Sequence, residues 1–192
     1  MSFLLPMNPP HLPARRRFFV RSTGLIATAA LPAWARASAS ANAPEGRAIE
    51  FFHTHTRERL DLVYAVGDRY VPDSLGRLNR FLRDHYTGEV GSMDPLLFEQ
   101  LHRVRELLGA TMHYEVISGY RCPETNSRLR AQGSGGVARK SLHMEGRAID
   151  LRLPGVPLAE LRDAALSLQA GGVGFYPDPQ FVHIDTGRVR HW

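Results

Sequence analysis

The feature that most constrains this chain is a set of three polar side chains that lie far apart in the sequence. His143 and Asp150 stand seven residues apart in the stretch SLHMEGRAID, and His183 follows in FVHID after a gap long enough for a helix. Two imidazoles and one carboxylate are a ligand set that catalytic zinc sites use, with the fourth position kept for water. We therefore predict a Zn²⁺ site built from these residues, and a fold that brings them together.

The composition and the charge distribution describe one globular domain behind a basic leader. The 192 residues, of which 43% are hydrophobic, are enough for a single buried core. The formal net charge of +5 would favour an anionic partner. However, five arginines lie in the first 37 residues, which contain no acid, and the remaining basic residues equal the 19 acidic ones in number. We therefore expect no nucleic-acid partner.

Residues 1–37 have the features of an export signal. Arg15 and Arg16 open the twin-arginine pattern RRRFFV, and an apolar stretch over 24–33 and an A-x-A cleavage pattern at 35–37 follow. The alternative is an uncleaved anchor, but the apolar run is shorter than the roughly 20 residues of a spanning helix. We predict a twin-arginine signal peptide over 1–37, with a second cleavage candidate at 39–41, and export to the periplasm. No stable membrane span is expected after cleavage.

Hydrophobic periodicity predicts an α+β domain over 48–192, joined to the leader by a linker over 38–47. His53 and His55 in the first predicted strand could bind a metal, but the sequence offers no further ligand beside them, so we expect a structural role. Strands are predicted over 49–56, 61–66, 114–118, 149–153, 172–176 and 181–185, and helices over 73–85, 95–108 and 157–168 and from Pro123 onward.

The motif around the first histidine resembles that of a known family. The pattern S-x-H-x-x-G-x-A-x-D is the first zinc motif of the D-Ala-D-Ala metallopeptidases, which share their fold with the hedgehog signalling domain. SGYRCPETN at 118–126 resembles the family's upstream motif, and the closing stretch GGVGFYPDPQFVHIDTGRVRHW resembles the YcbK/MepK-like murein endopeptidases. The resemblance covers about 48–192 and implies a small antiparallel sheet with helices packed on one side and zinc in an open cleft. The motif is matched at Ser141, His143, Gly146, Ala148 and Asp150.

The resemblance also implies an activity, which is zinc-assisted hydrolysis of peptidoglycan cross-bridges between D-configured centres. Zinc would lower the pKa of its water towards about 7. Arg121, at the turn after a predicted strand, would bind the substrate carbonyl and stabilise the oxyanion. The expected partners are peptidoglycan stem peptides and cross-bridges, and we expect a monomer. Two alternatives are a zinc D,D-carboxypeptidase, which would release terminal D-alanine, and a non-catalytic zinc-containing module that binds the cell wall.

One position departs from the wider family. The D,D-dipeptidases carry a glutamate as general base three residues before the last zinc ligand, and this chain has Gln180 there, which cannot take a proton at neutral pH. Asp185 is our first candidate for the base because it shares a strand face with His183, and His191 and Asp178 follow. Asp185 could instead orient His183. The sequence leaves both roles open.

Overall fold

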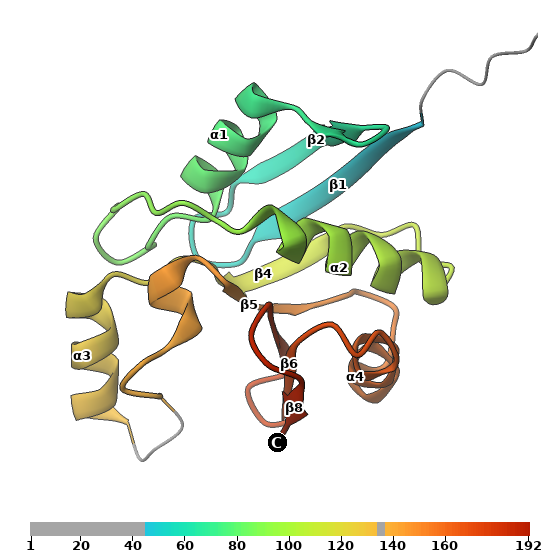
Figure 1. The fold of residues 1–192 in the computed structure, drawn as a ribbon. Coiled ribbons are helices and arrows are strands. Elements are labelled where there is room, and N and C mark those ends of the chain that lie inside the picture. The colour runs from blue at the N-terminus through green and yellow to red at the C-terminus, as the bar shows by residue number, and fades with distance from the viewer. Residues whose placement is uncertain (1–44, 134–136) are drawn as a thin grey trace, which may run out of the picture. The chain divides into compact units, whose positions relative to one another are not determined.

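The computed structural model describes residues 45–133 and 137–192, which form an α+β domain around one sheet (Figure 1). The predicted signal peptide and most of the predicted linker lie outside the described residues. The first strand begins at Gly46, two residues before the predicted start of the domain. Within these two ranges, every helix is too short or too polar to cross a membrane.

The sheet has eight strands in the order β3-β2-β1-β4-β5-β7-β6-β8. Most neighbours are antiparallel, but β1 pairs with β4 and β6 pairs with β8 in parallel. This corrects the expectation of a small, wholly antiparallel sheet. The chain passes through two strands and two helices between β1 and β4, and such a long crossover permits a parallel return. The strands are β1 (Gly46–His53), β2 (Arg59–Val66), β3 (Arg69–Tyr70), β4 (Tyr114–Ser118), β5 (Ala148–Arg152), β6 (Gly172–Tyr176), β7 (Phe181–Asp185) and β8 (Arg190–His191).

Local signals in the sequence explain where the helices begin. The N-cap of α2 is Asp94, whose carboxylate accepts a hydrogen bond from the Leu96 amide at 3.0 Å, and Pro95 occupies the first helical position. Proline also opens α1 and α3. The four helices are α1 (Pro72–Phe81), α2 (Pro95–Leu107), α3 (Pro123–Gln132) and α4 (Leu158–Ser167).

Helix α1 ends four residues before its predicted end at His85. The reason is the buried carboxylate of Asp84, which accepts hydrogen bonds from the backbone amides of Tyr86 and Cys122, both at 2.9 Å. These bonds fold the chain into a turn at the point where the apolar pattern alone would continue the helix.

A single hydrophobic cluster joins α1, α2 and α4 to the sheet. Strand alternation places Ile49 and Phe51 of β1 in this core, while Glu50 between them and Phe52 after them are only partly buried. Helix α2 contributes fully buried side chains at helical spacing, namely Leu97, Phe98, Leu101 and Val104. The sheet is thereby held rigid beneath the site described next.

Helix α3 lies away from the sheet, beside the segment that leads into β5 (Figure 1). Two hydrogen bonds fix this placement. The Arg121 amide donates to the carbonyl of His143 at 3.1 Å, and the Asn126 side-chain amide donates to the carbonyl of Ala138 at 3.2 Å. The turn between β4 and α3 therefore brings Arg121 next to one of the predicted metal ligands.

Candidate metal centre

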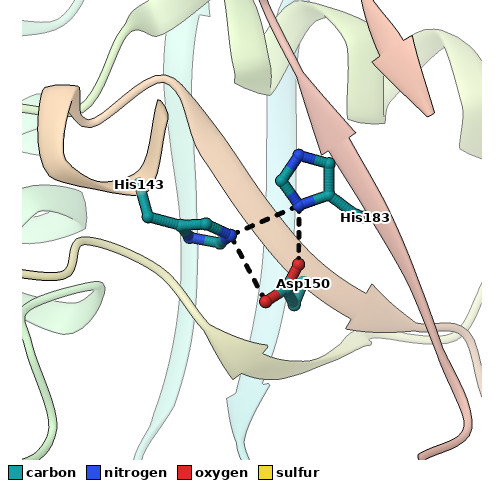
Figure 2. Close-up of side chains that lie close together, drawn as sticks. All are labelled: His143, Asp150 and His183. Carbon is teal, nitrogen blue, oxygen red and sulfur yellow. Dashed lines mark hydrogen bonds and ion pairs between the residues drawn. The ribbon is translucent and has the colours of Figure 1, made fainter. Parts of the chain in front are cut away.

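The three predicted ligands converge, as Figure 2 shows. Nε2 of His143 lies 3.3 Å from Nδ1 of His183 and 3.3 Å from Oδ2 of Asp150. Nδ1 of His183 lies 2.8 Å from Oδ1 of Asp150. All three residues are buried, and their ligand atoms lie within 4.8 Å of one another. Among the residues that the structure describes, this is the one group of histidine, cysteine and acidic side chains with such spacing.

Sheet register places two of these ligands side by side. Strands β5 and β7 are antiparallel neighbours, and Asp150 and His183 are directly paired across them. Residues that face each other in this way point to the same side of the sheet. His143 comes from a short 3₁₀ turn, η1 (Leu142–Glu145), which precedes β5 and was not predicted from the sequence.

Gly146 has a steric role in the zinc motif. It follows η1 with φ of +66°, and a Cβ at this position would lie only 1.9 Å from the carbonyl oxygen of Ser92. Its own carbonyl accepts a hydrogen bond from the Asp94 amide at 2.9 Å. Glycine is the residue that tolerates both the left-handed backbone and the close approach. The resulting turn delivers His143 and Asp150 to the same place.

Hydrogen bonds on the far side of each imidazole fix its tautomer. Nδ1 of His143 donates to the carbonyl oxygen of Gly119 at 2.7 Å, and Nε2 of His183 donates to Asp185 at 3.0 Å. A carbonyl or an ionised carboxylate only accepts, so these nitrogens carry the hydrogen. The opposite nitrogens face the other two residues of the group. A metal ion would bind there through their lone pairs and, at His183, would displace the hydrogen that the protonated ring carries on Nδ1.

The charges in the cluster favour a cation. Burial would raise the pKa of Asp150, but the charges and hydrogen bonds of His143 and His183 outweigh it and hold this pKa well below its usual range. Burial would lower the pKa of His183, but hydrogen bonds to Asp150 and Asp185 raise it to about 9. Two ionised, buried carboxylates thus surround one imidazole. The carboxylate of Asp150 and one nitrogen each from His143 and His183 make a set of one oxygen donor and two nitrogen donors, which fits a zinc ion.

A cleft of about 320 Å³ opens beside the three ligands. Arg121 contributes to its wall, and its guanidinium Nη2 lies 3.6 Å from Oδ2 of Asp150 and 3.3 Å from the Ser118 hydroxyl. A guanidinium so placed can donate to a carbonyl in the cleft. The cleft is lined by Arg121, Val137, Ala138, Lys140, Ser141, Leu142, His143, Asp150, Tyr176, Pro179, Phe181, His183, Arg190 and Trp192.

Asp185 lies outside this lining and is fully buried. Its carboxylate accepts hydrogen bonds from the amides of Gly172 and Gly187, at 3.0 and 2.8 Å, and from the Arg190 guanidinium at 2.7 and 3.2 Å. Burial would raise its pKa, but the bonds to His183 and Arg190 lower it well below the usual range. Asp185 therefore contacts the side of the His183 ring that faces away from the other ligands.

The remaining candidates for the base also lie outside the lining of the cleft. His191 is exposed, whereas its neighbours Arg190 and Trp192 line the cleft, as strand alternation requires. Asp178 and Gln180 are exposed in the turn between β6 and β7, where the Gln180 side chain donates to the carbonyl of Pro177. Within the described residues, Asp150 supplies the one acidic side chain in the lining.

Sequence reasoning missed several side chains of the cleft. Tyr176 and Phe181 stack on each other with ring centroids 4.6 Å apart, and Trp192 donates from its indole nitrogen to the Tyr176 hydroxyl at 2.7 Å. Lys140 lies directly before the zinc motif. Strand alternation does put Phe181 on the same face as His183, but the position of Trp192 depends on the pairing of β8, which is too short to show a pattern.

Comparison with known proteins identifies close relatives. The family model described as peptidoglycan L,D-endopeptidase MepK matches residues 41–192. The chain is 43% identical to peptidoglycan L,D-endopeptidase MepK of Escherichia coli K12 over 178 residues, which is 93% of this chain and 96% of the relative. It is 41% identical to the probable peptidoglycan L,D-endopeptidase MepK of Haemophilus influenzae over 155 residues, which is 80% and 83% of the two chains. No solved structure matches the chain.

Proposed function

The chain belongs to the peptidoglycan L,D-endopeptidase MepK family, and on this premise we propose that it is a zinc-dependent endopeptidase that hydrolyses peptidoglycan cross-links in the periplasm. The convergence of His143, Asp150 and His183 beside a cleft is the observation that carries the proposal. The relatives are named for an L,D specificity. The expected bond between two D-configured centres is therefore replaced by a bond between an L and a D centre.

The three ligands would hold the metal through Nε2 of His143, Nδ1 of His183 and the carboxylate of Asp150. When bound, zinc supplies a Lewis acid that polarises a carbonyl and acidifies water. The protein would keep the lone pairs of the two imidazole nitrogens directed at one point. The Gly119 carbonyl does this for His143, and Asp185 does it for His183.

Arg121 would bind the oxygen of the scissile carbonyl. Its guanidinium is always charged and offers several hydrogen-bond donors. It can therefore stabilise the negative charge that develops on that oxygen in the transition state. Its contacts with Ser118 and Asp150 support this role, because they hold the group in the cleft before substrate binds.

We assign Asp185 as a positioning residue in preference to the general base. Its two oxygens already accept hydrogen bonds from two amides, a guanidinium and His183, and it lies outside the cleft lining. A base must reach the proton that it removes, either directly or through one water. The enclosure of Asp185 instead suits a group that fixes the orientation of a metal ligand.

Cross-linked muropeptide dimers test the proposed function. The purified protein should convert dimers to monomers, and a chelator should abolish this conversion, which added zinc should restore. Release of free D-alanine from monomeric stem peptides would instead indicate a D,D-carboxypeptidase. Intact dimers in the presence of stoichiometrically bound zinc would contradict the proposal.

A further inference from the structure

The cleft is cationic apart from the metal ligands. Its lining contains Arg121, Lys140 and Arg190, and among the described residues the one acidic side chain in it is that of Asp150, which is a proposed ligand. A bound divalent ion would add further positive charge. A cleft of this kind attracts a substrate that carries carboxylates.

Two of the three cations are already paired. Arg121 lies against Asp150, and Arg190 donates two hydrogen bonds to Asp185. Lys140 is exposed, and within the described ranges it forms no ion pair. Its ammonium group is therefore free to bind an anion from outside the chain. It is also the one lysine in the whole sequence, whose other basic residues are arginines.

Trp192 supplies an apolar surface in the same cleft. Its backbone pairs with β6 through bonds to Phe175 and Val173 at 3.0 and 3.3 Å. Its indole lies over Gly174, where an added Cβ would come within 2.7 Å of the ring. The Arg190 guanidinium stacks on the ring at 4.9 Å.

These contacts fix the indole, yet 49% of the Trp192 surface is exposed. The ring centroid lies 5.3 Å from that of His183. A fixed, half-exposed aromatic ring beside a metal ligand offers area to a bound molecule at little entropic cost. The core does not need this side chain for burial, so its ordered position favours a role in binding.

We propose that Lys140 and Trp192 form a substrate subsite beside the metal centre, in which the Lys140 ammonium binds a free carboxylate of the peptide and the Trp192 indole packs against its aliphatic portion. This inference rests on the proposed function. It adds the feature of the substrate that the cleft recognises, which is a free carboxylate close to the scissile bond.

Steady-state kinetics on two matched substrates test the role of Lys140. The first is a cross-linked peptide dimer with free carboxylates, and the second is the same dimer with these groups converted to carboxamides. Lys140→Met should raise KM for the carboxylate substrate roughly tenfold, the loss of one charge-assisted hydrogen bond, and leave kcat within about twofold. KM for the carboxamide should not change. Lys140→Arg should preserve most of the affinity.

Arg139→Met is the matched control, because Arg139 is an exposed neighbouring cation that does not line the cleft. It should leave both KM values unchanged. Equal effects of Lys140→Met on the two substrates, or no effect on either, would overturn the assignment of Lys140. If the unmodified protein cleaves neither substrate, the proposed function itself fails, which is a distinguishable result.

Trp192 is tested in the same assay with three variants. Trp192→Leu should raise KM for both substrates, since the apolar contact does not depend on the carboxylate, and Trp192→Phe should raise it less. Gly174→Ala should reproduce the effect of Trp192→Leu by displacing the indole, with zinc content unchanged. Unaltered KM values in all three variants would remove Trp192 from the subsite.

The chain provides a direct reporter for each residue. In the full chain carrying Trp34→Phe, Trp192 is the sole tryptophan, and Lys140 carries the sole lysine amine. With turnover stopped by a chelator, the carboxylate dimer should change Trp192 fluorescence and slow acylation of Lys140, as followed by peptide mass mapping. An unchanged fluorescence spectrum or an unchanged acylation rate at saturating dimer would contradict the corresponding half of the proposal.

Discussion

At the scale of the residue, the metal centre depends on atoms that face away from it. The carboxylate of Asp185 accepts a hydrogen bond from Nε2 of His183, and it also accepts hydrogen bonds from the backbone amides of Gly172 and Gly187. A Cβ on Gly172 would meet Asp185 at 2.5 Å, so these glycines leave room for the carboxylate. The sequence presents Asp185 only as an acid near a histidine. Its role follows from what surrounds it.

We predict that Asp185→Asn weakens zinc binding by roughly 10- to 100-fold, the usual cost of losing a carboxylate that orients a ligand. An amide can still accept from the backbone, but it no longer supplies the charge that stabilises the His183 tautomer. Competition with a fluorescent chelator measures the affinity. Asp163→Asn, which alters an exposed carboxylate paired with Arg162, is the control. Equal affinities in the two variants would show that Asp185 does not position the ligand.

We predict that Gly146→Ala lowers the free energy of unfolding by at least about 2 kcal/mol, through backbone strain and the clash with Ser92. It should also reduce zinc content, because the turn after His143 must shift. Urea denaturation and metal analysis measure the two effects. Gly155→Ala is the control, since Gly155 has φ of +80° but open space around its Cα. Gly155→Ala should lower the free energy of unfolding by less than Gly146→Ala does, and it should leave the zinc content unchanged. Similar losses in both variants would argue against the close approach as the cause.

At the scale of the element, β1 ends at the buried His53, whose ring lies beside those of the exposed His55 and the partly buried His85. The His55 and His85 rings stack at 4.1 Å, and the His53 ring lies 5.5 Å from His85. Nδ1 of His53 accepts from the His55 amide at 3.2 Å, so the hydrogen lies on Nε2. Within the described residues, neither Nε2 of His53 nor that of His85 has a hydrogen-bond partner, and the three residues do not form a group with metal-ligand spacing.

This cluster makes stability depend on pH. Burial, and then neighbouring histidines and cations, lower the pKa of His53 to about 4, and burial and His55 lower that of His85 to about 4. The unfolded chain, with histidine pKa values near 6.5, binds protons first as the pH falls. The contribution of His53 and His85 to stability should therefore be complete above about pH 6.5 and decline between about pH 6.5 and 4, by roughly 3 kcal/mol for His53. Chemical denaturation at pH 7 and pH 5 measures the decline.

His53→Asn is the informative variant for this pH dependence. Its side-chain oxygen can replace Nδ1 as the acceptor for the His55 amide, but it does not titrate. The slope of stability against pH between 7 and 5 should become shallower. A slope equal to that of the unmodified chain would place the acid sensitivity elsewhere.

The elements also show what the sequence could and could not predict. Strands β4, β6 and β7 were predicted with their observed limits, because alternating side chains and turn residues mark them locally. Strands β3 and β8 have two residues each, which is too few for any periodicity. The parallel pairing of β1 with β4 depends on the route of the intervening chain. The sequence identified His143 and Asp150 through a local motif and His183 through the closing stretch of the chain, and the structure brings these three candidate ligands together. Trp192, by contrast, reaches the cleft only through the pairing of β8 with β6.

At the scale of the whole molecule, the excess of basic residues lies in residues 1–37, and residues 38–192 contain equal numbers of basic and acidic residues. Residues 1–37 are the basis for the proposed export route, since Arg15 and Arg16 match the twin-arginine pattern. We predict that replacing both arginines with lysine retains the precursor in the cytoplasm. Cell fractionation and immunoblotting of precursor and mature forms measure this. Undiminished periplasmic protein in the double variant would exclude the twin-arginine route.

The direct pairing of Asp150 with His183 ties catalysis to correct folding. A slip of one residue between β5 and β7 would turn one of the two side chains to the opposite face and dismantle the ligand set. Metal binding then favours the native register by mass action, because a slipped sheet cannot bind the ion. A copy with the wrong register is consequently inactive. For an enzyme that hydrolyses the wall of its own cell, the correct register is therefore a condition for hydrolysis.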